Sequence, residues 1–356
     1  MTVTLEELGG WPFILGRLSS GRDLSAAETT AAFGDVFEGN ATPSQLAAFI
    51  FGLRCKGETV EEMTGMVSAM MAAAELVPLS PALAARVVDT CGTGGDRSGT
   101  INVSTIAAFV VAGAGVPVCK HGNRSISSKA GSADLLESLG VVIGLGPDQV
   151  AACVERAGMG FCFAPRFHPS MRHAGPTRRE LGVPTVFNFL GPLANPARTR
   201  RQVVGVSDPA MADKMAGVLA ANGAVRSLVV YGHDGLDELT TTDCSTVVSS
   251  WLDEVGERHL ETYQVDPVAL GLPRVGKADL LGGDAATNAE LAQRVLGGEK
   301  GPRRDIVLLN AAAGLMVAGE AADLSSGLAI AASVLDDGRA AQRLALLVEV
   351  SQEVAD

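Results

Sequence analysis

The amino-acid sequence predicts an α/β protein in which a small all-helical domain is joined to a larger α/β domain with a mainly parallel central sheet. Residues 4–75 show only helical periodicity, whereas short apolar strands alternate with helices from Val87 onward. Such alternation is expected of a parallel sheet covered on both faces. It breaks between Arg166 and Pro196, where five prolines and several arginines occur. We expect this segment to leave the sheet and pack against the N-terminal helices.

The N-terminal segment predicts four consecutive helices, at residues 5–18, 25–38, 42–55 and 60–74. Each begins near a residue whose side-chain oxygen can cap a helix N-terminus; these residues are Thr4, Ser25, Thr42 and Thr59. The fourth helix carries a methionine stripe, which indicates helix packing, with a contact between subunits as the alternative. The stripe comprises Met63, Met66, Met70 and Met71.

The remaining chain predicts six strands and eight helices around the break. The apolar strands are expected at residues 87–89, 116–118, 160–163, 203–206, 227–231 and 246–252. The helical patterns cover residues 105–114, 133–139, 147–157, 209–222, 288–296, 306–316, 325–336 and 344–354. No strand pattern precedes Val87, so the sheet should belong to the larger domain alone.

Composition and charge disfavour several classes of function. The 356-residue chain carries a net charge of -12, which disfavours a general electrostatic grip on nucleic acid or anionic lipid. Its six cysteines lack metal-site spacing and do not suggest a disulfide framework. The N-terminus does not read as a secretory signal, and no apolar run approaches the roughly 20 residues of a membrane span. We expect a cytoplasmic protein.

A glycine turn between a strand and a helix predicts an anion site. Gly92-Thr93-Gly94-Gly95-Asp96 follows the first strand, and Asn102, Ser104 and Thr105 open the next helix. Glycines let backbone N–H groups approach an oxyanion, and a helix start adds unpaired N–H groups. The turn matches neither a nucleoside triphosphate loop nor a dinucleotide fingerprint. The alternative is a tight turn followed by a satisfied polar loop.

A second polar stretch follows within thirty residues. Lys120-His121-Gly122-Asn123-Arg124 supplies two cations and an amide, and Ser127 and Ser128 add hydroxyls before the next helix. Two such stretches close together predict a ligand with more than one phosphate.

Adjacent acids follow the strand at residues 227–231. Asp237 and Glu238 would lie at the carboxyl end of that strand, the edge where open α/β sheets bind ligands. Two carboxylates facing a polyphosphate would repel it, so the pair predicts an intervening Mg²⁺ ion. Solvated loop acids are the alternative.

A group of arginines and histidines lies in the segment that interrupts the alternation. It comprises Arg172, Arg178, Arg179, His168 and His173. An arginine can hold a planar carboxylate through two parallel hydrogen bonds, so the group suggests an acidic second substrate. Surface ion pairs for the arginines and packed or solvated histidines are the alternatives.

Over nearly its whole length the chain resembles the anthranilate phosphoribosyltransferases. The resemblance rests on GTGGD (92–96), NVST (102–105), KHGNRSISSKAGSAD (120–134), FCFAPRFHPSMR (161–172), PTRRELGVPTVFNFLGPLANP (176–196), GLDE (235–238), GGDAATNA (282–289) and LLNAAAGL (308–315). It implies transfer of the phosphoribosyl group of phosphoribosyl pyrophosphate to the amine of anthranilate, in tryptophan biosynthesis. It also implies Mg²⁺ as cofactor, a helical domain of residues 1–75 with 168–190 that forms a homodimer, and an α/β domain of residues 76–167 with 191–356.

The same resemblance implies the residues of the site. Phosphoribosyl pyrophosphate would bind Gly92, Gly94, Gly95, Asp96, Thr100, Asn102, Ser104, Thr105, Lys120, Asn123 and Ser132. Anthranilate would lie against Gly92, His121, Asn123, His168, Arg178, Gly191 and Pro192. Ser104 with Glu238 would hold one Mg²⁺ ion, and Asp237 with Glu238 a second. Lys120 would stabilise the departing pyrophosphate, and Arg178 would position the anthranilate carboxylate.

Departures from the family pattern are few, and three alternative functions stay open. Arg97 stands where a small residue is expected after GTGGD, and Ser170 replaces a usual alanine. Arg97 either adds an anion contact or points to solvent.

A pyrimidine nucleoside phosphorylase would share the architecture but need no Mg²⁺. A non-catalytic nucleic-acid-binding relative and a ligand-binding structural protein are the other two alternatives.

Overall fold

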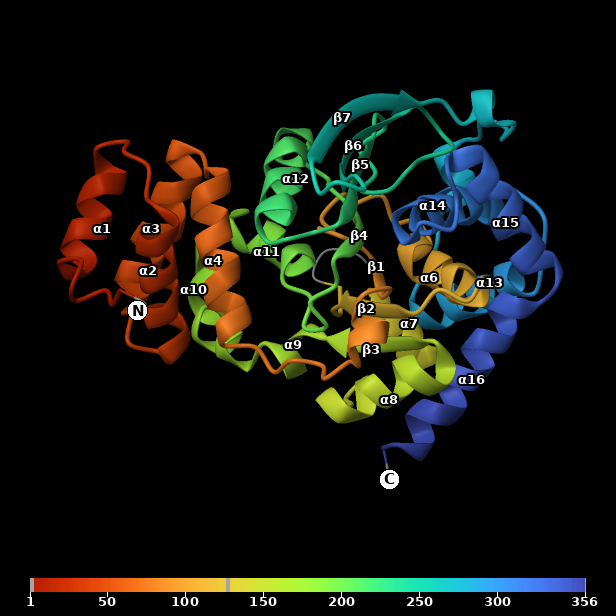
Figure 1. Ribbon diagram of the computed structural model, residues 1–356, viewed down its shortest axis with the longest axis horizontal. Helices are drawn as coiled ribbons and strands as arrows, with labels where there is room; N and C mark the ends of the chain where they lie inside the picture. Colours follow the sequence, from red (N-terminus) through yellow and green to blue (C-terminus); the bar gives the residue numbers. More distant parts are fainter. Residues whose placement is uncertain (1–2, 126–128, 356) are drawn as a thin grey trace.

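The computed structural model describes residues 3–125 and 129–355. Figure 1 shows an N-terminal helical bundle at one end of the molecule, a twisted sheet in the middle, and further helices beyond the sheet. This arrangement confirms the predicted fold class, a helical domain with a larger α/β domain. No helix in the described part of the chain is long and apolar enough to cross a membrane.

The N-terminal bundle begins later than expected. Its helices are α1 (Gly10–Ser19), α2 (Ala26–Glu38), α3 (Pro43–Lys56) and α4 (Val60–Ala72). The last three begin with reciprocal capping boxes at the expected N-caps. The predicted start of α1 near Thr4 is wrong. Gly9 and Gly10 have φ values of 96° and 71°, which interrupt a right-handed helix, so residues 5–9 form turns.

The sheet has seven strands in the order β3-β2-β1-β4-β5-β6-β7. Its first five strands run parallel, and β6 and β7 are added antiparallel. The strands are β1 (Val88–Gly92), β2 (Val118–Gly122), β3 (Met159–Phe163), β4 (Arg201–Gly205), β5 (Arg226–Gly232), β6 (Ser245–Leu252) and β7 (Arg258–Val265). The order changes direction between β1 and β4, which makes their carboxyl ends a topological switch point.

Three strand predictions need correction. The strand expected at residues 87–89 runs from Val88 to Gly92, so Gly92 ends the strand instead of following it. The strand expected at residues 116–118 begins at Val118 and continues to Gly122. Pro117 cannot donate a ladder hydrogen bond, and the polar Lys120 and His121 concealed the buried strand. The edge strand β7 was not predicted, because its exposed side chains are mostly polar or charged and leave no apolar alternation.

Helices cover both faces of the sheet. One face packs on α6 (Val103–Gly113), α14 (Pro302–Ala318) and their neighbours, and the other on α12 (Ala212–Ala221) and the N-terminal bundle (Figure 1). Alternate strand residues enter the two cores, as the two-residue period of a strand requires. Val203 and Leu228 join the first core, whereas Val204 and Val229 join the second. Outside the bundle and the proline-rich segment, the remaining helices are, in chain order, α5 (Pro81–Ala84), α7 (Ser132–Ser138), α8 (Pro147–Ala157), η2 (Pro209–Met211), η3 (Val268–Leu270), η4 (Lys277–Leu280), α13 (Ala285–Leu296), α15 (Leu324–Asp336) and α16 (Arg339–Glu353).

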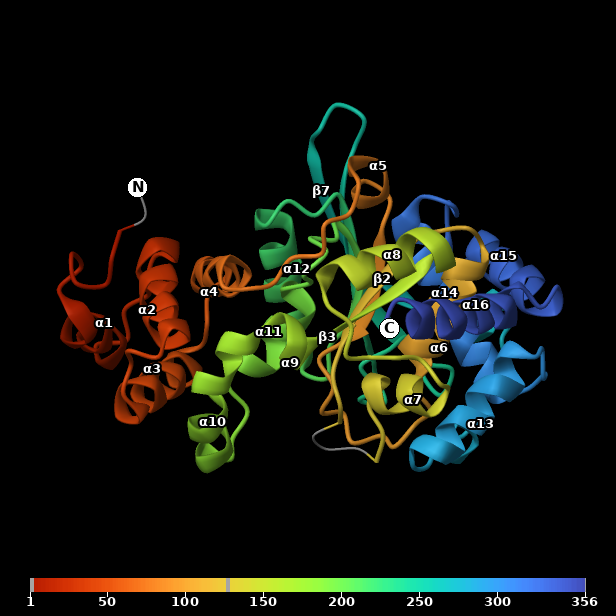
Figure 2. The ribbon, with the colours of Figure 1, turned by 90° about the horizontal axis from the view of Figure 1, so that it is seen from below.

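The proline-rich segment leaves the sheet, as the sequence predicts. It forms α9 (Ala164–Phe167), η1 (Pro169–His173), α10 (Gly175–Leu181) and α11 (Phe187–Leu193). Figure 2 shows α10 beside α3, although more than a hundred residues separate them, and the two helices are in contact. The Phe187 ring lies 5.2 Å from the Phe33 ring of α2. The second core therefore extends without a break from the bundle to the sheet.

Candidate active site

Two paired glycines make room for an acidic loop at the switch point. Gly92 ends β1 and lies opposite Gly205 of β4. A Cβ atom on Gly92 would collide with the Asp237 carboxylate, and one on Gly205 would collide with the Asp237 backbone carbonyl. The close approach of three chain segments therefore requires glycine at both positions. No motif in the sequence marks Gly205 as a site residue.

The glycine turn contacts this acidic loop directly. Gly94 and Gly95 have φ values of 66° and 83°, a left-handed conformation that glycine adopts without steric cost. The backbone N–H of Gly94 donates to Asp237 Oδ2 over 2.7 Å, and Asp96 also interacts with Asp237. Residues 94–96 and the acid at position 237 form one site, although more than 140 residues separate them.

The N-terminus of α6 meets the second acid of the loop. The backbone N–H of Ser104 donates to Glu238 Oε1 over 3.0 Å, so the carboxylate occupies part of the helix N-terminus. Asn102 donates to the Ala130 carbonyl over 3.1 Å and accepts from Asn288 over 2.9 Å. Thr105 is buried. These contacts place residues 102–105 at the predicted edge of the sheet.

Two further predicted residues lie around the glycine turn and α6. The Thr100 hydroxyl is 3.1 Å from that of Ser98. Ser132 donates to the Asn123 carbonyl over 3.2 Å. Both residues are polar and partly exposed.

Lys120 is a buried cation beneath this edge. Only 1% of the residue is exposed, and it lies in β2, not in the expected loop. Its Nζ atom donates to the Thr90 carbonyl and lies 3.3 Å from Ser104 Oγ. A buried ammonium group is costly unless its hydrogen bonds are satisfied. The strand and the helix start thus hold one positive charge in a fixed place.

The acidic pair has strongly perturbed titration. Burial, followed by repulsion from Asp96, raises the pKa of Asp237 to about 7. Burial, followed by repulsion from Asp237, raises the pKa of Glu238 to about 8. Each side chain keeps some solvent exposure but lies largely among protein atoms. Carboxylates crowded in this way fit a bound cation, which would let both stay ionised together.

The donor set around the pair suits a hard cation. The oxygens of Asp237, Glu238 and Ser104 lie at one edge of the sheet, and oxygen is the ligand that Mg²⁺ prefers. Within the described residues, no three His, Cys, Asp or Glu side chains form a metal-binding group. An ion here would complete its coordination with water and substrate oxygens.

The second polar stretch supplies fewer cations than the sequence suggests. Arg124 forms ion pairs with Asp134 and Glu137, at 2.7 and 2.8 Å. The Asn123 side chain accepts from the Arg124 backbone over 2.7 Å. The Arg124 charge is therefore neutralised within the protein, which corrects its expected role as a phosphate cation. Ser127 and Ser128 lie outside the described residues.

Two buried histidines lie together beside α11. The rings of His121 and His168 are 5.2 Å apart. Nδ1 of His121 is 2.9 Å from the Gly191 carbonyl, and Nε2 of His168 is 2.9 Å from the Ala194 carbonyl. Since a carbonyl oxygen only accepts, each of these nitrogens carries the proton. The other nitrogens, Nε2 of His121 and Nδ1 of His168, are buried without a partner among the described residues.

Both imidazoles are neutral at physiological pH. Burial lowers the pKa of His121 to about 3 and that of His168 to about 4. For His121 the second cause is repulsion from His168. Each ring therefore keeps an unshared lone pair on a buried nitrogen.

An unpredicted polar network holds this region. Asp89 is fully buried in β1 and accepts from the His121 backbone over 3.2 Å and from Asn195 over 2.8 Å. Asn195 also donates to the Cys119 carbonyl over 2.8 Å. The network ties β1 and β2 to the chain after α11. In the sequence, an acidic residue at position 89 within a buried strand was the sign that a polar network lies here.

Within the proline-rich segment, Arg178 is the arginine whose side chain reaches toward the interior. Its guanidinium lies over the Phe187 ring, 4.8 Å from the centroid, and burial lowers its pKa. No carboxylate of the described chain forms an ion pair with it under a 4.0 Å criterion. Arg172, His173 and Arg179 are exposed, so the arginines do not converge on one site. Pro192, also predicted, accepts from Gln202 through its carbonyl over 2.9 Å.

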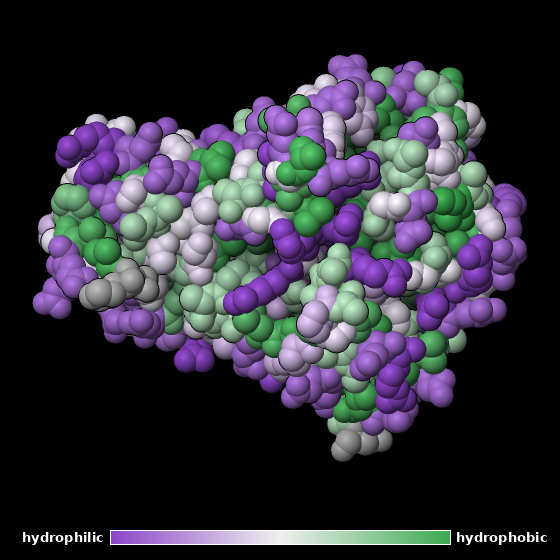
Figure 3. Space-filling view, in the orientation of Figure 1, coloured by the Kyte–Doolittle hydropathy of each residue, from purple (hydrophilic) through white to green (hydrophobic). Residues whose placement is uncertain are grey.

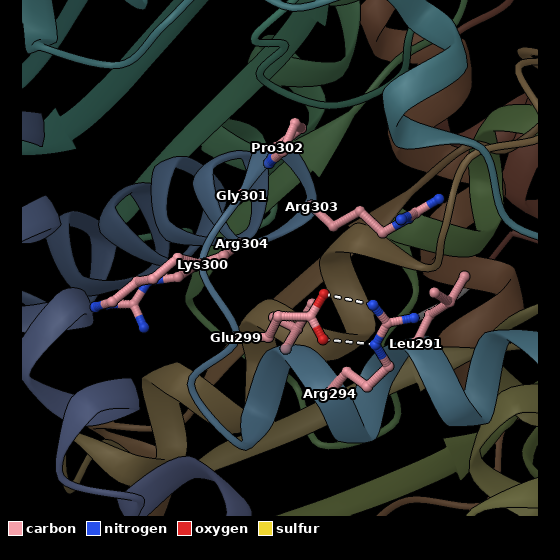
Figure 4. A pocket seen from close by; sticks show the side chains of 9 residues that line it. Leu291, Arg294, Glu299, Lys300, Gly301, Pro302, Arg303 and Arg304 are labelled. Atoms are coloured by element: carbon pink, nitrogen blue, oxygen red, sulfur yellow. Dashed lines mark hydrogen bonds and ion pairs between the residues drawn. The ribbon is translucent and has the colours of Figure 1, made fainter.

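A separate surface pocket has no part in this arrangement. It lies between α13 and α14, and none of the predicted site residues lines it. Figure 4 shows Arg294 paired with Glu299, and Lys300 and Arg304 both pair with Asp336. Three of the basic side chains that line the pocket are thus engaged in ion pairs within the chain.

Comparisons with known proteins agree with this geometry. Residues 84–341 match the glycosyl transferase family, a/b domain, and residues 13–74 match its helical bundle domain. The chain is 50% identical over 351 residues to an anthranilate phosphoribosyltransferase of Rhodococcus jostii, covering 97% of this chain and 94% of that protein. It is 51% identical over 349 residues to the corresponding protein of Salinispora arenicola, covering 97% of each.

Solved structures show the same likeness. The anthranilate phosphoribosyltransferase of Thermus thermophilus matches with a TM-score of 0.88 and 41% identity, over 95% of this chain and 99% of that one. The Saccharomyces cerevisiae protein in complex with PRPP and Mg matches with a TM-score of 0.86 and 26% identity, over 96% and 98%. The resemblance seen in the sequence is thus confirmed by whole-length relatives. This chain belongs to the anthranilate phosphoribosyltransferase family.

Proposed function

We propose that this chain transfers the 5-phosphoribosyl group of phosphoribosyl pyrophosphate (PRPP) to the amine of anthranilate, as a step of tryptophan biosynthesis. The amine nitrogen forms a bond to C1 of the ribose, the bond from C1 to the pyrophosphate oxygen breaks, and the amine loses one proton. One observation carries the proposal. The glycine turn, the N-terminus of α6, Lys120 and the acidic pair meet at one sheet edge.

PRPP binding is assigned to the polar edge around α6. The proposed contacts are Gly92, Gly94, Gly95, Asp96, Thr100, Asn102, Ser104, Thr105, Lys120, Asn123 and Ser132. A helix N-terminus favours negative charge through its unpaired N–H groups. Lys120, held by Thr90 and Ser104, adds a fixed positive charge beside the departing pyrophosphate. Charge held in place before the reaction stabilises the transition state without further reorganisation.

Ser104, Asp237 and Glu238 would hold Mg²⁺, and we propose two ions for each site. When bound, Mg²⁺ neutralises charge on the pyrophosphate and so makes it a better leaving group. A yeast relative is known in complex with PRPP and Mg, which supports this assignment.

Anthranilate is assigned to the region between Arg178 and the two histidines. Arg178 can bind the carboxylate through two parallel hydrogen bonds, and it has no ion-pair partner within the described chain under a 4.0 Å criterion. The lone pairs of His121 and His168 can accept the amine N–H groups. Gly92, Asn123, Gly191 and Pro192 complete the proposed contacts. The yeast protein is also known in complex with 4-fluoroanthranilate, which supports an aromatic site.

The neutral amine of anthranilate needs no strong base before it attacks. Positioning should therefore contribute more than deprotonation. After the bond forms, the nitrogen is positively charged, and an unprotonated imidazole at His121 or His168 can accept the proton.

We also propose the domain division, the assembly and the location expected from the sequence. Residues 1–75 with 168–190 would form the helical domain, and residues 76–167 with 191–356 the α/β domain. Phe13 of α1 and Phe51 of α3 are 39% and 49% exposed, and Figure 3 shows hydrophobic residues spread over the bundle. Such a surface supports a homodimer formed through the bundle. The six cysteines, which form no disulfide, fit a cytoplasmic location.

The activity is tested by the fluorescence of anthranilate. Fluorescence should fall when the protein, PRPP and Mg²⁺ are all present, and should stay constant when any one component is omitted. Cleavage of thymidine or uridine by phosphate without Mg²⁺ would instead indicate a nucleoside phosphorylase. A salt-sensitive DNA gel shift without turnover would indicate a nucleic-acid-binding relative.

A further inference from the structure

Arg97 adopts a backbone conformation that disfavours a side chain. Its φ value is 55°, and within the described residues only Arg198, at 50°, shares a positive φ without being glycine. Its neighbours Gly95 and Gly99 have φ values of 83° and 67°. A residue with a Cβ atom is strained in this region. Strain of this kind persists where the surrounding structure or a function requires it.

Arg97 also differs from the other cations of the site in being exposed without an ion pair to a described residue. It is the one basic residue of the stretch 92–105, and its side chain is exposed. Lys120 is buried against Thr90 and Ser104, and Arg124 is neutralised by two acids. Under a 4.0 Å criterion, no ion pair with a described residue occupies Arg97.

The position of Arg97 is set by the contacts on either side of it. Asp96 accepts from the Ser98 backbone over 3.3 Å, and its carboxylate lies close enough to Asp237 to repel that carboxylate. Gly94 donates to Asp237 over 2.7 Å. The turn that carries Arg97 is thereby attached to Asp237, one of the carboxylates proposed to hold Mg²⁺.

We propose that Arg97 binds the pyrophosphate group of PRPP and sets the affinity for this substrate. The inference rests on the proposed function. A guanidinium forms parallel hydrogen bonds to a phosphate, and a net charge of -12 makes each local cation valuable for an anionic ligand. Arg97 would act on binding and not on the bond that breaks, because it lies on an exposed turn.

The test compares Arg97→Gly with Arg198→Gly. Both variants remove one exposed arginine charge and relieve one positive φ, but Arg198 precedes β4 and therefore lies near the amino end of the sheet. Arg97→Gly should raise the KM for PRPP by about 3- to 10-fold, with kcat and the KM for anthranilate within about 2-fold. Arg198→Gly should leave all three constants within about 2-fold of wild type. Neither variant should lower the melting temperature, since glycine suits both positions.

Pyrophosphate itself is the second probe. Its inhibition constant should rise in Arg97→Gly by a factor similar to the KM change, and both effects should shrink as salt is raised to about 0.5 M. Arg97→Gln, which keeps a polar side chain and the strain but not the charge, should resemble Arg97→Gly. Arg97→Lys should recover part of the affinity.

Several outcomes would overturn the inference. One is an unchanged KM for PRPP in an active, folded Arg97→Gly. Another is an equal change in Arg198→Gly, which would indicate a general charge effect. A raised KM with an unchanged inhibition constant for pyrophosphate would place Arg97 elsewhere on PRPP. Failure of the proposed function is distinct, because wild-type protein would then show no PRPP-dependent loss of anthranilate fluorescence.

Discussion

Arg178 is the residue that we propose to bind the carboxylate of the acidic substrate. It lies over the Phe187 ring, is partly desolvated, and makes no ion pair within the described chain under a 4.0 Å criterion. A guanidinium removed from water gains strongly from a carboxylate that arrives with matching geometry.

Replacing Arg178 by alanine should weaken the use of anthranilate. The lost charge-assisted pair, about 1.5–3 kcal/mol, predicts a fall in kcat/KM for anthranilate of about 10- to 150-fold. Steady-state kinetics with saturating PRPP measure the effect. Arg178→Lys is the control, because it keeps the charge but loses the bidentate geometry and should retain an intermediate kcat/KM. Wild-type kinetics in the alanine variant would exclude the role.

His168 gives a pH dependence whose sign follows from its burial. Its pKa falls to about 4 in the folded protein against about 6.5 in an unfolded chain. Between these two pH values the unfolded state binds more protons than the folded state. The free energy of unfolding therefore has its full value well above pH 6.5 and decreases as the pH falls toward 4. Relative to His168→Asn, wild type should lose about 1 kcal/mol of unfolding free energy between pH 7.5 and 5.5. Urea denaturation of both proteins at the two pH values measures this difference. A difference that does not change with pH would mean that His168 is not buried in neutral form.

At the scale of elements, the site depends on where strand ends and loops meet. Short apolar runs at residues 87–89, 203–206 and 227–231 made β1, β4 and β5 recognisable. The carboxyl ends of these three strands form the edge that carries the site. β2 was misplaced because Lys120 and His121 interrupt its apolar pattern. β7 was missed because an exposed edge strand has no core face to mark it.

Gly205→Ala should disrupt the active site more than the fold. The added Cβ would overlap the Asp237 carbonyl, so the acidic loop must move away from β4. We expect a loss of about 1–3 kcal/mol in stability and a fall in kcat/KM of at least about 10-fold. Melting curves and turnover measure the two effects. Gly34→Ala in α2 is the control, because a Cβ there meets no atom within 4 Å and should leave turnover unchanged.

The acidic loop after β5 should control the magnesium response. Asp237→Asn and Glu238→Gln keep shape but remove a carboxylate charge, so activation should require more Mg²⁺, with turnover reduced at least about 10-fold. Turnover measured against Mg²⁺ concentration, alongside circular dichroism to verify the fold, tests both variants. Asp234, which accepts from Thr240 over 2.9 Å, provides the control Asp234→Asn, whose Mg²⁺ response should match wild type. Normal activation in Asp237→Asn and Glu238→Gln would remove the metal assignment.

At the scale of the molecule, the helical bundle and the sheet share a continuous core. The proline-rich segment makes this connection, since α10 contacts α3 and α11 contacts β2. This packing fixes where Arg178, His168 and Gly191 lie between the bundle and the sheet. A subunit contact on the bundle would support this same region from outside.

The proposed dimer predicts a change in mass on altering the bundle surface. Wild type should elute with about twice the chain mass of 36.5 kDa, whereas Phe51→Glu should shift toward one chain mass, because a charge would be buried in an apolar contact. Light scattering coupled to size exclusion measures both. Val255→Glu, at an 86% exposed position on the hairpin between β6 and β7, is the matched control and should stay dimeric. Wild type eluting as a single chain would refute the dimer.

Local chemistry in the chain was enough to predict the fold class and the edge of the sheet that carries the site. Apolar periodicity, capping residues and the glycine turn act over a few neighbouring residues, so their pattern survives in the sequence. Tertiary packing alone settles which charged groups are paired, buried or exposed. It neutralises Arg124 with Asp134 and Glu137, buries Lys120 and leaves Arg97 exposed in a strained turn, because ion pairing and burial depend on segments far apart along the chain.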